Sequence, residues 1–288
     1  MLLFDTVANG LFIGALYAVV ALAFSIQWGV LGIINLAHGM FVVLGAYLTL
    51  ELHDSLGVDP FLAIPLVLLI FFICGVILQF FVINRIMRAS LWVTLVLTFG
   101  LQFLIIGLTL LFFTADEQLV TTSYSGDAVT IAGLRLPLSR LGLLAVAVVF
   151  SLAVALFLRN TRAGLAISAT ASDRDAARLS GIPVARFYAL AFGLGIGLAG
   201  VAGAMLSFTE PFTPNTGVSL TLKAFVITIL GGFGSVSGVL AGGLLLGLIE
   251  AFSAVYIGAA YINVISFVLL VALLIFRPQG LMGTVVKE

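Results

Sequence analysis

Residues 61–83 have the sequence FLAIPLVLLIFFICGVILQFFVI, which contains no charged side chain. An α-helix needs about 20 consecutive apolar residues to cross the hydrocarbon core of a bilayer. This stretch is long enough, so it predicts a transmembrane helix. Six other stretches are comparably apolar, at residues 7–26, 31–50, 91–113, 141–158, 187–208 and 255–276. Together they predict an all-α integral membrane protein, a bundle of helices that crosses the bilayer many times.

The composition of the chain supports this fold class. Of its 288 residues, 62% are hydrophobic and only 8% are charged, whereas about 25% of the residues of a soluble domain are charged. The 12 basic and 12 acidic side chains cancel, so the charge balance predicts no nucleic-acid partner. Cys74 is the only cysteine, which excludes disulfides and thiolate metal sites within the chain.

The distribution of charge predicts the orientation of the helices. Basic residues collect in the cytoplasmic loops of membrane proteins. Nine of the 12 basic residues are therefore expected on the cytoplasmic side: Arg85, Arg88, Arg159, Arg162, Arg174, Arg178, Arg186, Arg277 and Lys287. The opposite set of loops carries Glu51, Asp54, Asp59, Asp116, Glu117, Asp127 and Glu210.

Parity then predicts the number of crossings. The chain is expected outside near Glu210 and inside by Arg277, so an odd number of helices lies between them. The apolar residues of this interval are too many for one helix and suffice for three, at 220–231, at 239–254 and ending at 276. The prediction is nine crossings with the N-terminus outside and the C-terminus inside. Eight crossings with a re-entrant glycine segment is the alternative.

A glycine-rich run, GGFGSVSG, occupies residues 231–238. Gly231, Gly232, Gly234 and Gly238 are predicted to break a helix there, which is tolerated at membrane depth only where protein or a water-filled cavity surrounds the backbone. The run lacks the Gly-Lys-Ser/Thr ending of a phosphate-binding loop. No nucleotide site, catalytic residue or cofactor is therefore predicted in this chain.

Residues 114–140 form the one sizeable external loop of the predicted topology. Apolar and polar residues alternate at 129–136, which predicts a small β-hairpin. The loop is either a solvated lid without a ligand or a docking surface for an extracytoplasmic partner. The whole chain, 1–288, is expected to be a single transmembrane domain.

The cytoplasmic segment at 159–187 contains a short, bounded helix by its sequence. Ser172 is predicted to cap its N-terminus, and Asp173 and Asp175 lie in the first turn, where the helix dipole favours carboxylates. Gly181 is predicted to end the helix in a left-handed conformation. Asp175 and Arg178 have the spacing of an ion pair on one helix face. Such a short helix needs a surface to lie against, either its own bundle or another protein.

Residues 164–182 resemble the coupling-helix motif of the permeases of ATP-binding-cassette importers, in particular of the importers of branched-chain amino acids. Three further stretches agree: GLFIGALYA at 10–18 followed by GIINLAHG at 32–39; LGGFGS at 230–235 with later glycines; and FRPQGL at 276–281. The NLAHG pattern favours the shorter of the two permease types of the high-affinity leucine, isoleucine and valine uptake system. Met40 departs from the pattern, because relatives often carry an acidic residue there.

The resemblance implies a division of labour between subunits. This chain would form half of the translocation path in a bacterial inner membrane, beside a second, related permease. Two separate ATPase subunits would hydrolyse ATP, and an extracytoplasmic binding protein would deliver the amino acid. The residues that would dock the ATPase are Asp173, Arg174, Asp175, Ala176, Ala177, Arg178, Leu179 and Gly181, with Ala176 and Ala177 allowing a close approach. Related importers of urea, amides or other amino acids are the alternative.

Four polar side chains within the predicted spans are candidates for function, since such groups are costly in lipid. They are Asn35, His38, Gln102 and Glu250. Each either joins helices or lines the translocation path. His38 and His53 are not expected to share a metal, because one lies in a span and the other in an external loop. An ion-coupled secondary transporter remains a rival, for which Glu250 is the one intramembrane carboxylate.

Overall fold

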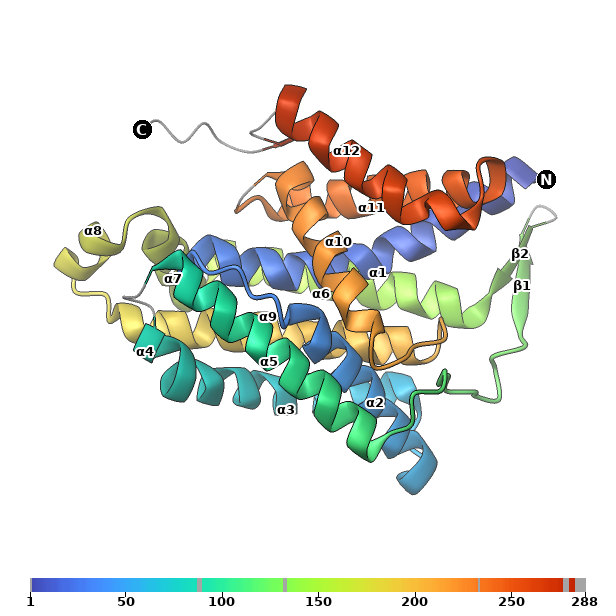
Figure 1. Cartoon of the computed structure of the whole chain (residues 1–288), viewed down its shortest axis with the longest axis horizontal. Helices are drawn as coiled ribbons and strands as arrows, with labels where there is room; N and C mark the ends of the chain where they lie inside the picture. The colour runs from blue at the N-terminus through green and yellow to red at the C-terminus, as the bar shows by residue number, and fades with distance from the viewer. Residues whose placement is uncertain (1, 87–89, 132–133, 233, 277–279, 283–288) are drawn as a thin grey trace.

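The computed structural model describes residues 2–86, 90–131, 134–232, 234–276 and 280–282, and most of them are helical (Figure 1). The long helices are α1 (Leu2–Leu31), α2 (His38–Leu56), α3 (Pro60–Leu78), α5 (Leu91–Phe112), α6 (Leu138–Asn160), α9 (Val184–Ser207), α10 (Thr216–Gly231), α11 (Val236–Tyr256) and α12 (Ile262–Phe276). The short elements are η1 (Gln79–Ile83), α4 (Asn84–Ile86), β1 (Ala128–Ile131), β2 (Leu134–Pro137), α7 (Arg162–Ser172), α8 (Arg174–Leu179) and η2 (Ala259–Tyr261).

Six helical segments of the described chain are long and apolar enough to cross a membrane. One of them is the continuous segment Pro60–Ile86, which comprises α3, η1 and α4. The other five are α1, α5, α6, α9 and α11. The fold is thus that of an all-helical membrane protein. Helices α2, α10 and α12 occupy the positions of the other three predicted crossings but are shorter or less apolar. The total of nine crossings therefore stays a prediction.

The helices divide into a buried core and an apolar outer layer. Buried residues make up 89% of the membrane-length segment of α9 and 72% of that of α1, but only 28% for α3 and 22% for α5 and α6. The three exposed helices are also more apolar than the two buried ones. Leucine and phenylalanine side chains on α5 point outward, as at Leu111 and Phe112. A surface of this kind is stable against lipid and not against water.

Small residues bring the core helices close together. A Cβ atom at Gly247 of α11 would lie 2.3 Å from the backbone nitrogen of Gly14 in α1. At Gly203 of α9, a Cβ would lie 2.0 Å from the carbonyl oxygen of Val42 in α2. Membrane helices associate mainly through such close packing, because lipid gives no hydrophobic drive for association. Glycine at these two positions is therefore what lets the helices approach so closely.

The second predicted crossing differs from its sequence-based bounds. The stretch at 31–50 was expected to be one helix, but α1 continues to Leu31 and α2 begins only at His38. Gly32 ends α1 with φ of 68°. Residues 32–37 then run back along the bundle without regular structure, with a turn at 36–37, so that the His38 ring meets the carbonyl oxygen of Val20, 3.0 Å away. Helix α2 therefore starts beside the middle of α1.

The glycine-rich run separates two helices. Helix α10 is regular up to Gly231, and α11 begins at Val236. Between them, Gly232 has φ of 92° and Gly234 has φ of 73°. The Ser235 hydroxyl caps α11 by accepting a hydrogen bond from the Gly238 nitrogen. Phe233 lies outside the described residues. A Cβ at Gly238 would lie 2.0 Å from the carbonyl oxygen of Gly231, so glycine is needed for the two helices to meet there.

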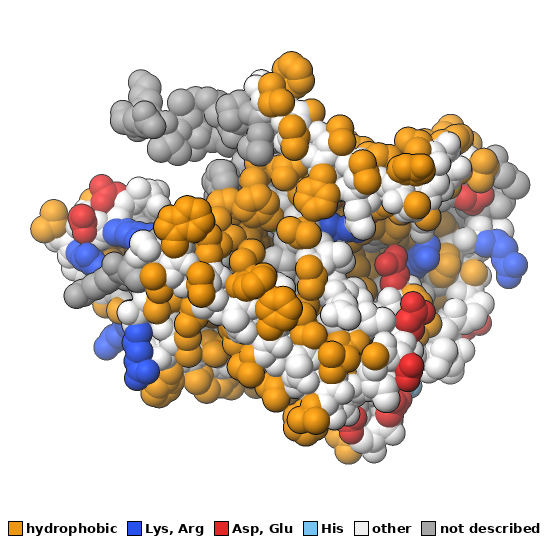
Figure 2. Space-filling view, in the orientation of Figure 1, with side chains coloured by type: hydrophobic (Ala, Val, Ile, Leu, Met, Phe, Trp, Pro, Cys, Tyr) orange, Lys and Arg blue, Asp and Glu red, His pale blue; other side chains and the backbone are white. Residues whose placement is uncertain are grey.

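The two ends of the molecule carry different charges. Figure 1 shows most long helices along the long axis, with α8 near one end and the two strands near the other. In Figure 2, acidic side chains gather toward the end with the strands and most basic ones toward the end with α8, although each kind occurs at both ends. This separation is what the predicted orientation requires. Arg88, Arg277 and Lys287, which were part of that prediction, lie outside the described residues.

The loop between α5 and α6 is fastened to the end of the bundle that carries the acidic residues. Gln118 pairs with Phe212 through two backbone hydrogen bonds, and the Tyr124 hydroxyl donates one to the Asp59 carboxylate, 2.9 Å away. Burial, and secondly the hydrogen bond to Asp59, raise the pKa of Tyr124 to about 12. Strands β1 and β2 pair antiparallel. Residues 132–133 between them lie outside the described residues, so the predicted external hairpin stays a prediction.

Candidate functional site

The short helix α8 lies at the basic end of the molecule and is bounded much as expected. It spans Arg174–Leu179, and Gly181 follows in the left-handed conformation with φ of 79°. The capping residue is Asp173 and not Ser172: its carboxylate accepts hydrogen bonds from the nitrogens of Asp175 and Ala176. Ser172 instead ends α7, a preceding helix that the sequence analysis did not predict. Both residue types are good N-caps, and the backbone turns at the later one.

The sequence predicts that Ala176 and Ala177 of α8 both allow close approach of a partner, but only one of them faces outward. Ala177 is 3% exposed and packs against its own chain, whereas Leu179 is 91% exposed. Arg178 and Asp175 form a solvent-exposed ion pair at 3.3 Å. Ala176 is exposed. The outward surface of α8 is thus one exposed leucine beside a pair of opposite charges.

Arg174 fixes α8 to the rest of the protein. Its guanidinium donates a hydrogen bond of 2.7 Å to the carbonyl oxygen of Leu31, the last residue of α1. The same group lies 5.6 Å from the centre of the Tyr188 ring of α9. A cation at the C-terminal end of a helix also interacts favourably with the helix dipole. A Cβ at Gly32 would come within 2.8 Å of this guanidinium, so the glycine leaves room for the contact.

Asn35 and His38 meet a third residue, Gln27, in a buried network of neutral groups. The Gln27 side chain lies 3.1 Å from Nδ1 of His38 and accepts a hydrogen bond of 2.9 Å from Nδ2 of Asn35. Oδ1 of Asn35 in turn accepts from the Ala37 nitrogen. All three side chains are at most 1% exposed. We call Gln27, Asn35 and His38 the neutral cluster; it supports the irregular chain at 32–37.

Glu250 belongs to a second network, which carries charge. Its Oε2 accepts hydrogen bonds from the Tyr17 hydroxyl at 2.7 Å and from the Lys223 ammonium at 2.8 Å. Its Oε1 accepts one from the Ser266 hydroxyl at 2.8 Å. The Lys223 ammonium also contacts the Tyr17 hydroxyl. These four residues, the charged cluster, join α1, α10, α11 and α12.

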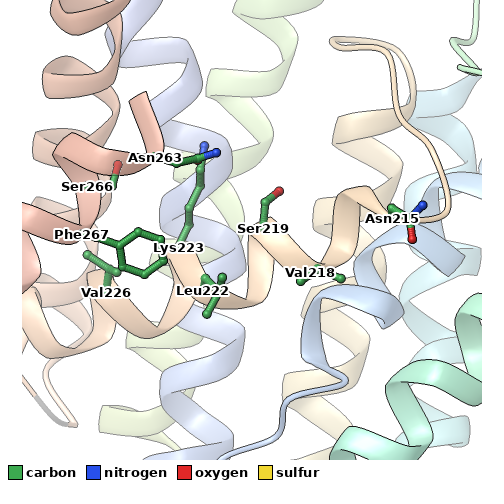
Figure 3. A pocket seen from close by; sticks show the side chains of 9 residues that line it. All are labelled: Asn215, Val218, Ser219, Leu222, Lys223, Val226, Asn263, Ser266 and Phe267. Carbon is green, nitrogen blue, oxygen red and sulfur yellow. The ribbon is translucent and has the colours of Figure 1, made fainter. Parts of the chain in front are cut away.

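The charged cluster borders a cavity of about 240 Å³ between α10 and α12. Figure 3 shows Lys223 reaching from α10 toward Asn263 of α12, with Ser266 and Phe267 on the same helix. Leu222 and Val226 of α10 add apolar surface. Glu250 does not line the cavity, and its side chain is only 4% exposed against 15% for Lys223.

Gln102 stands apart from both clusters. It is 7% exposed and lies on α5, in the apolar outer layer. Within the described residues, none of the hydrogen bonds of the two clusters reaches it. Of the four polar side chains predicted from the sequence, the structure thus puts Asn35 and His38 together, Glu250 in a separate cluster, and Gln102 in neither.

The comparison with protein families decides the identity of this bundle. The model of the family described as "Branched-chain amino acid transport system / permease component" matches residues 6–274. The chain belongs to this family.

Known branched-chain amino acid permease sequences resemble the chain along nearly all of its length. The high-affinity branched-chain amino acid transport system permease protein BraD of Pseudomonas aeruginosa is 31% identical, over 96% of this chain and 94% of its own. The permease protein LivH of Escherichia coli K12 is 30% identical over the same shares. A probable LivH permease of Methanocaldococcus jannaschii is 28% identical, over 93% of this chain and 89% of its own. No solved structure gives a significant match.

Four members of the two clusters in this permease were not predicted from the sequence: Tyr17, Gln27, Lys223 and Ser266. Lys223 had a signal, because it is a basic residue inside the apolar stretch at 220–231 and fits neither set of charged loops. A lysine in such a place demands a partner, and Glu250 was the one carboxylate predicted at membrane depth. Tyr17 and Gln27 carried no such signal, since both are common in ordinary membrane helices.

Proposed function

We propose that this chain is the pore-forming permease subunit of an ATP-driven importer of branched-chain amino acids in a bacterial inner membrane. The observation that carries the proposal is the family match over residues 6–274. The relatives named above are permeases of branched-chain amino acid transport systems. This favours branched-chain amino acids over urea, amides or other substrates.

The permease works with other chains in this proposal. A second, related permease completes the pore, two ATPase subunits supply energy from the cytoplasm, and a binding protein delivers substrate to the outer loops. The single transmembrane domain, 1–288, supplies a path and performs no covalent chemistry. The pairing of Glu250 with Lys223 also argues against an ion-coupled transporter, because the carboxylate already has a cationic partner.

Helix α8 is the docking site for the ATPase in this proposal. The segment 159–187 presents charged groups of both signs and the exposed Leu179, which suits a groove that has an apolar floor and a polar rim. Arg174 and Gly181 hold the helix in place rather than contacting the partner. Ala177 supports α8 from below and Ala176 permits close approach. Gly231, Gly232, Gly234 and Gly238 allow the adjacent helices to shift together.

Uptake of labelled leucine tests the transport function. Vesicles that contain the complete transport system should accumulate leucine only with ATP and the binding protein. Accumulation that is driven by an ion gradient without ATP would contradict the proposal.

Co-purification tests the role of α8. Leu179→Asp should lose the ATPase subunits from the purified complex, because a buried interfacial leucine typically contributes about 2 kcal/mol or more. Leu56→Asp changes another leucine, 69% exposed, at the opposite end of the molecule and should retain them. Equal recovery of the ATPase with both variants would remove α8 from the interface.

A further inference from the structure

We infer that the cavity beside Lys223 is a binding site for the amino acid in transit, in which the Lys223 ammonium binds the α-carboxylate and Glu250 positions that ammonium. The inference rests on the proposed function and adds the place and the chemistry of recognition. The relatives are permeases of branched-chain amino acid transport systems, and their similarity to this chain assigns no residue to substrate binding.

Lys223 has the donor that a carboxylate requires. An ammonium group carries three N–H donors. Within the described residues, two of them serve Tyr17 and Glu250. Lys223 also lines the cavity, so the third donor is available to a ligand there. Hydrogen bonds between two charged partners are about twice as strong as neutral ones, and the low dielectric of the site increases the gain.

Glu250 holds the lysine without touching the cavity. Its two oxygens are taken by Tyr17, Lys223 and Ser266, from three different helices. The Glu250 carboxylate pairs with the Lys223 ammonium at 2.8 Å, and this attraction offsets the cost of placing a cation at this depth. Lys223 can therefore meet an anionic group. Because the pair is neutral overall, the empty site is tolerable inside the bundle.

The rest of the cavity fits the rest of a branched-chain amino acid. Asn263 and Ser219 offer oxygen acceptors for the α-ammonium group, and Figure 3 shows Asn263 beside the end of Lys223. Leu222, Val226 and Phe267 form apolar walls for the side chain. The cavity of about 240 Å³ is smaller than the roughly 300–1,000 Å³ of sites for drug-sized ligands. A solute of amino-acid size is therefore the fitting class.

The location of the cluster also suits a transit site. Tyr17 lies at the middle of α1, which spans Leu2–Leu31. The irregular chain at 32–37 ends at His38, close to Val20 on the same helix. In secondary transporters, substrate sites lie near the bilayer midplane beside interrupted helices. The charged cluster meets both conditions.

Protection of a reporter cysteine tests the inference. Ser219 lies one helical turn from Lys223 and lines the cavity. Vesicles with the complete transport system would carry Ser219→Cys in a Cys74→Ala background, and a small thiol reagent would label the new cysteine. Leucine should slow the labelling. Leucinamide, which lacks the carboxylate, should not slow it, and 4-methylpentanoate, which keeps the carboxylate, should slow it more weakly than leucine does.

Variants of the pair separate recognition from helix joining. In the Ser219→Cys reporter protein, Lys223→Met should raise the leucine concentration that halves the labelling rate about 10- to 100-fold. Lys223→Arg should keep most of the protection by leucine. Glu250→Gln should weaken protection to an intermediate degree. Because Lys223→Met leaves a buried carboxylate alone, the double variant Lys223→Met/Glu250→Gln serves as the folded control, and it should also lose protection.

The outcomes distinguish this inference from the proposed function. Equal protection by leucine and leucinamide, or undiminished protection in the double variant, would overturn the site while ATP-driven leucine uptake still stood. In that case the charged cluster only joins helices. Absence of ATP-driven leucine uptake in the unaltered system would overturn the proposed function instead, and the leucine–leucinamide difference would still decide what the cavity binds.

Discussion

The neutral cluster and the charged cluster each include a residue of α1 and lie beside α10, and they differ in nearly everything else. Helix α1 contributes Gln27 to one and Tyr17 to the other. Helix α10 contributes Lys223 to the charged cluster, and its Thr221 accepts a hydrogen bond of 2.8 Å from the Gly39 nitrogen beside the neutral cluster. The neutral cluster is sealed inside protein. The charged one borders a cavity.

The difference shows that polar groups inside a membrane protein serve two separate purposes. Gln27, Asn35 and His38 satisfy one another and the Ala37 nitrogen of an irregular segment, which lipid could not do. All three are at most 1% exposed, so they offer no surface to a ligand. Lys223 and Glu250 instead maintain a charge at a surface that a solute can reach. What separates the two clusters is the cavity, which Lys223 lines and no member of the neutral cluster does.

Removing one charge should give the largest effect on stability. Lys223→Met is expected to lower the free energy of unfolding by about 3–5 kcal/mol, because it leaves Glu250 buried without its cation. The double variant Lys223→Met/Glu250→Gln should recover most of this loss. Denaturant unfolding of the purified protein in detergent would measure both. Equal stability of the single and double variants would mean that the two charges are not coupled.

The next largest loss of stability is expected from a methyl group added beside the neutral cluster. A Cβ at Gly39 would lie 1.9 Å from the carbonyl oxygen of Gly217, which is backbone and cannot turn away. Gly39→Ala is expected to cost about 3 kcal/mol through overpacking of α2 against α10. Gly107→Ala is the matched control, since a Cβ at that glycine of α5 meets nothing within 4 Å. Similar melting temperatures for the two variants would show that α2 and α10 pack less closely.

Loss of one amide should separate the two clusters by function. Asn35→Leu leaves the Ala37 nitrogen and the Gln27 oxygen without their partner, at a cost of about 1–3 kcal/mol. The folded fraction should still protect the Ser219→Cys reporter with leucine and not with leucinamide. A changed preference between these two ligands would place the neutral cluster in the translocation path.

The smallest effect is expected outside both clusters, at the loop that Tyr124 fastens to Asp59. Tyr124→Phe should lower stability by about 1 kcal/mol or less at neutral pH. The pKa of Tyr124 is raised from 10.0 to about 12. Its contribution is thus fully present below pH 10 and is lost as pH rises toward 12. Unfolding measured at pH 8 and pH 11 should show a smaller difference between the two proteins at the higher pH.

Much of the fold was predictable because each exposed helix is apolar along its whole length. The stretches at 91–113 and 141–158 match α5 and α6 to within a few residues. The helix α7 was missed, since it is short and amphipathic and lies among arginines. The late start of α2 was also missed. An apolar sequence such as that at 31–37 does not reveal that its backbone carbonyls, at Ile34 and Leu36, accept hydrogen bonds from the side chains of Thr98 and Thr221 instead of continuing a helix.

The candidate site was predictable only in part, because its members are far apart in the chain. Glu250 stood out as a carboxylate in an apolar stretch. Its partners Tyr17 and Lys223 lie 233 and 27 residues away from it, so tertiary packing alone brings them together. The short helix at 174–179 was easier to predict, because the residues that begin and end it lie within one turn of each end.

The hydrogen bond between Arg174 and Leu31 gives α8 a mechanical connection to the interior. Helix α1 has 30 residues and so extends about 45 Å at 1.5 Å per residue. Its end is held by α8, and its midpoint carries Tyr17, which bonds the carboxylate beside Lys223. A displacement imposed on α8 is therefore transmitted through α1 to the residues that hold the lysine.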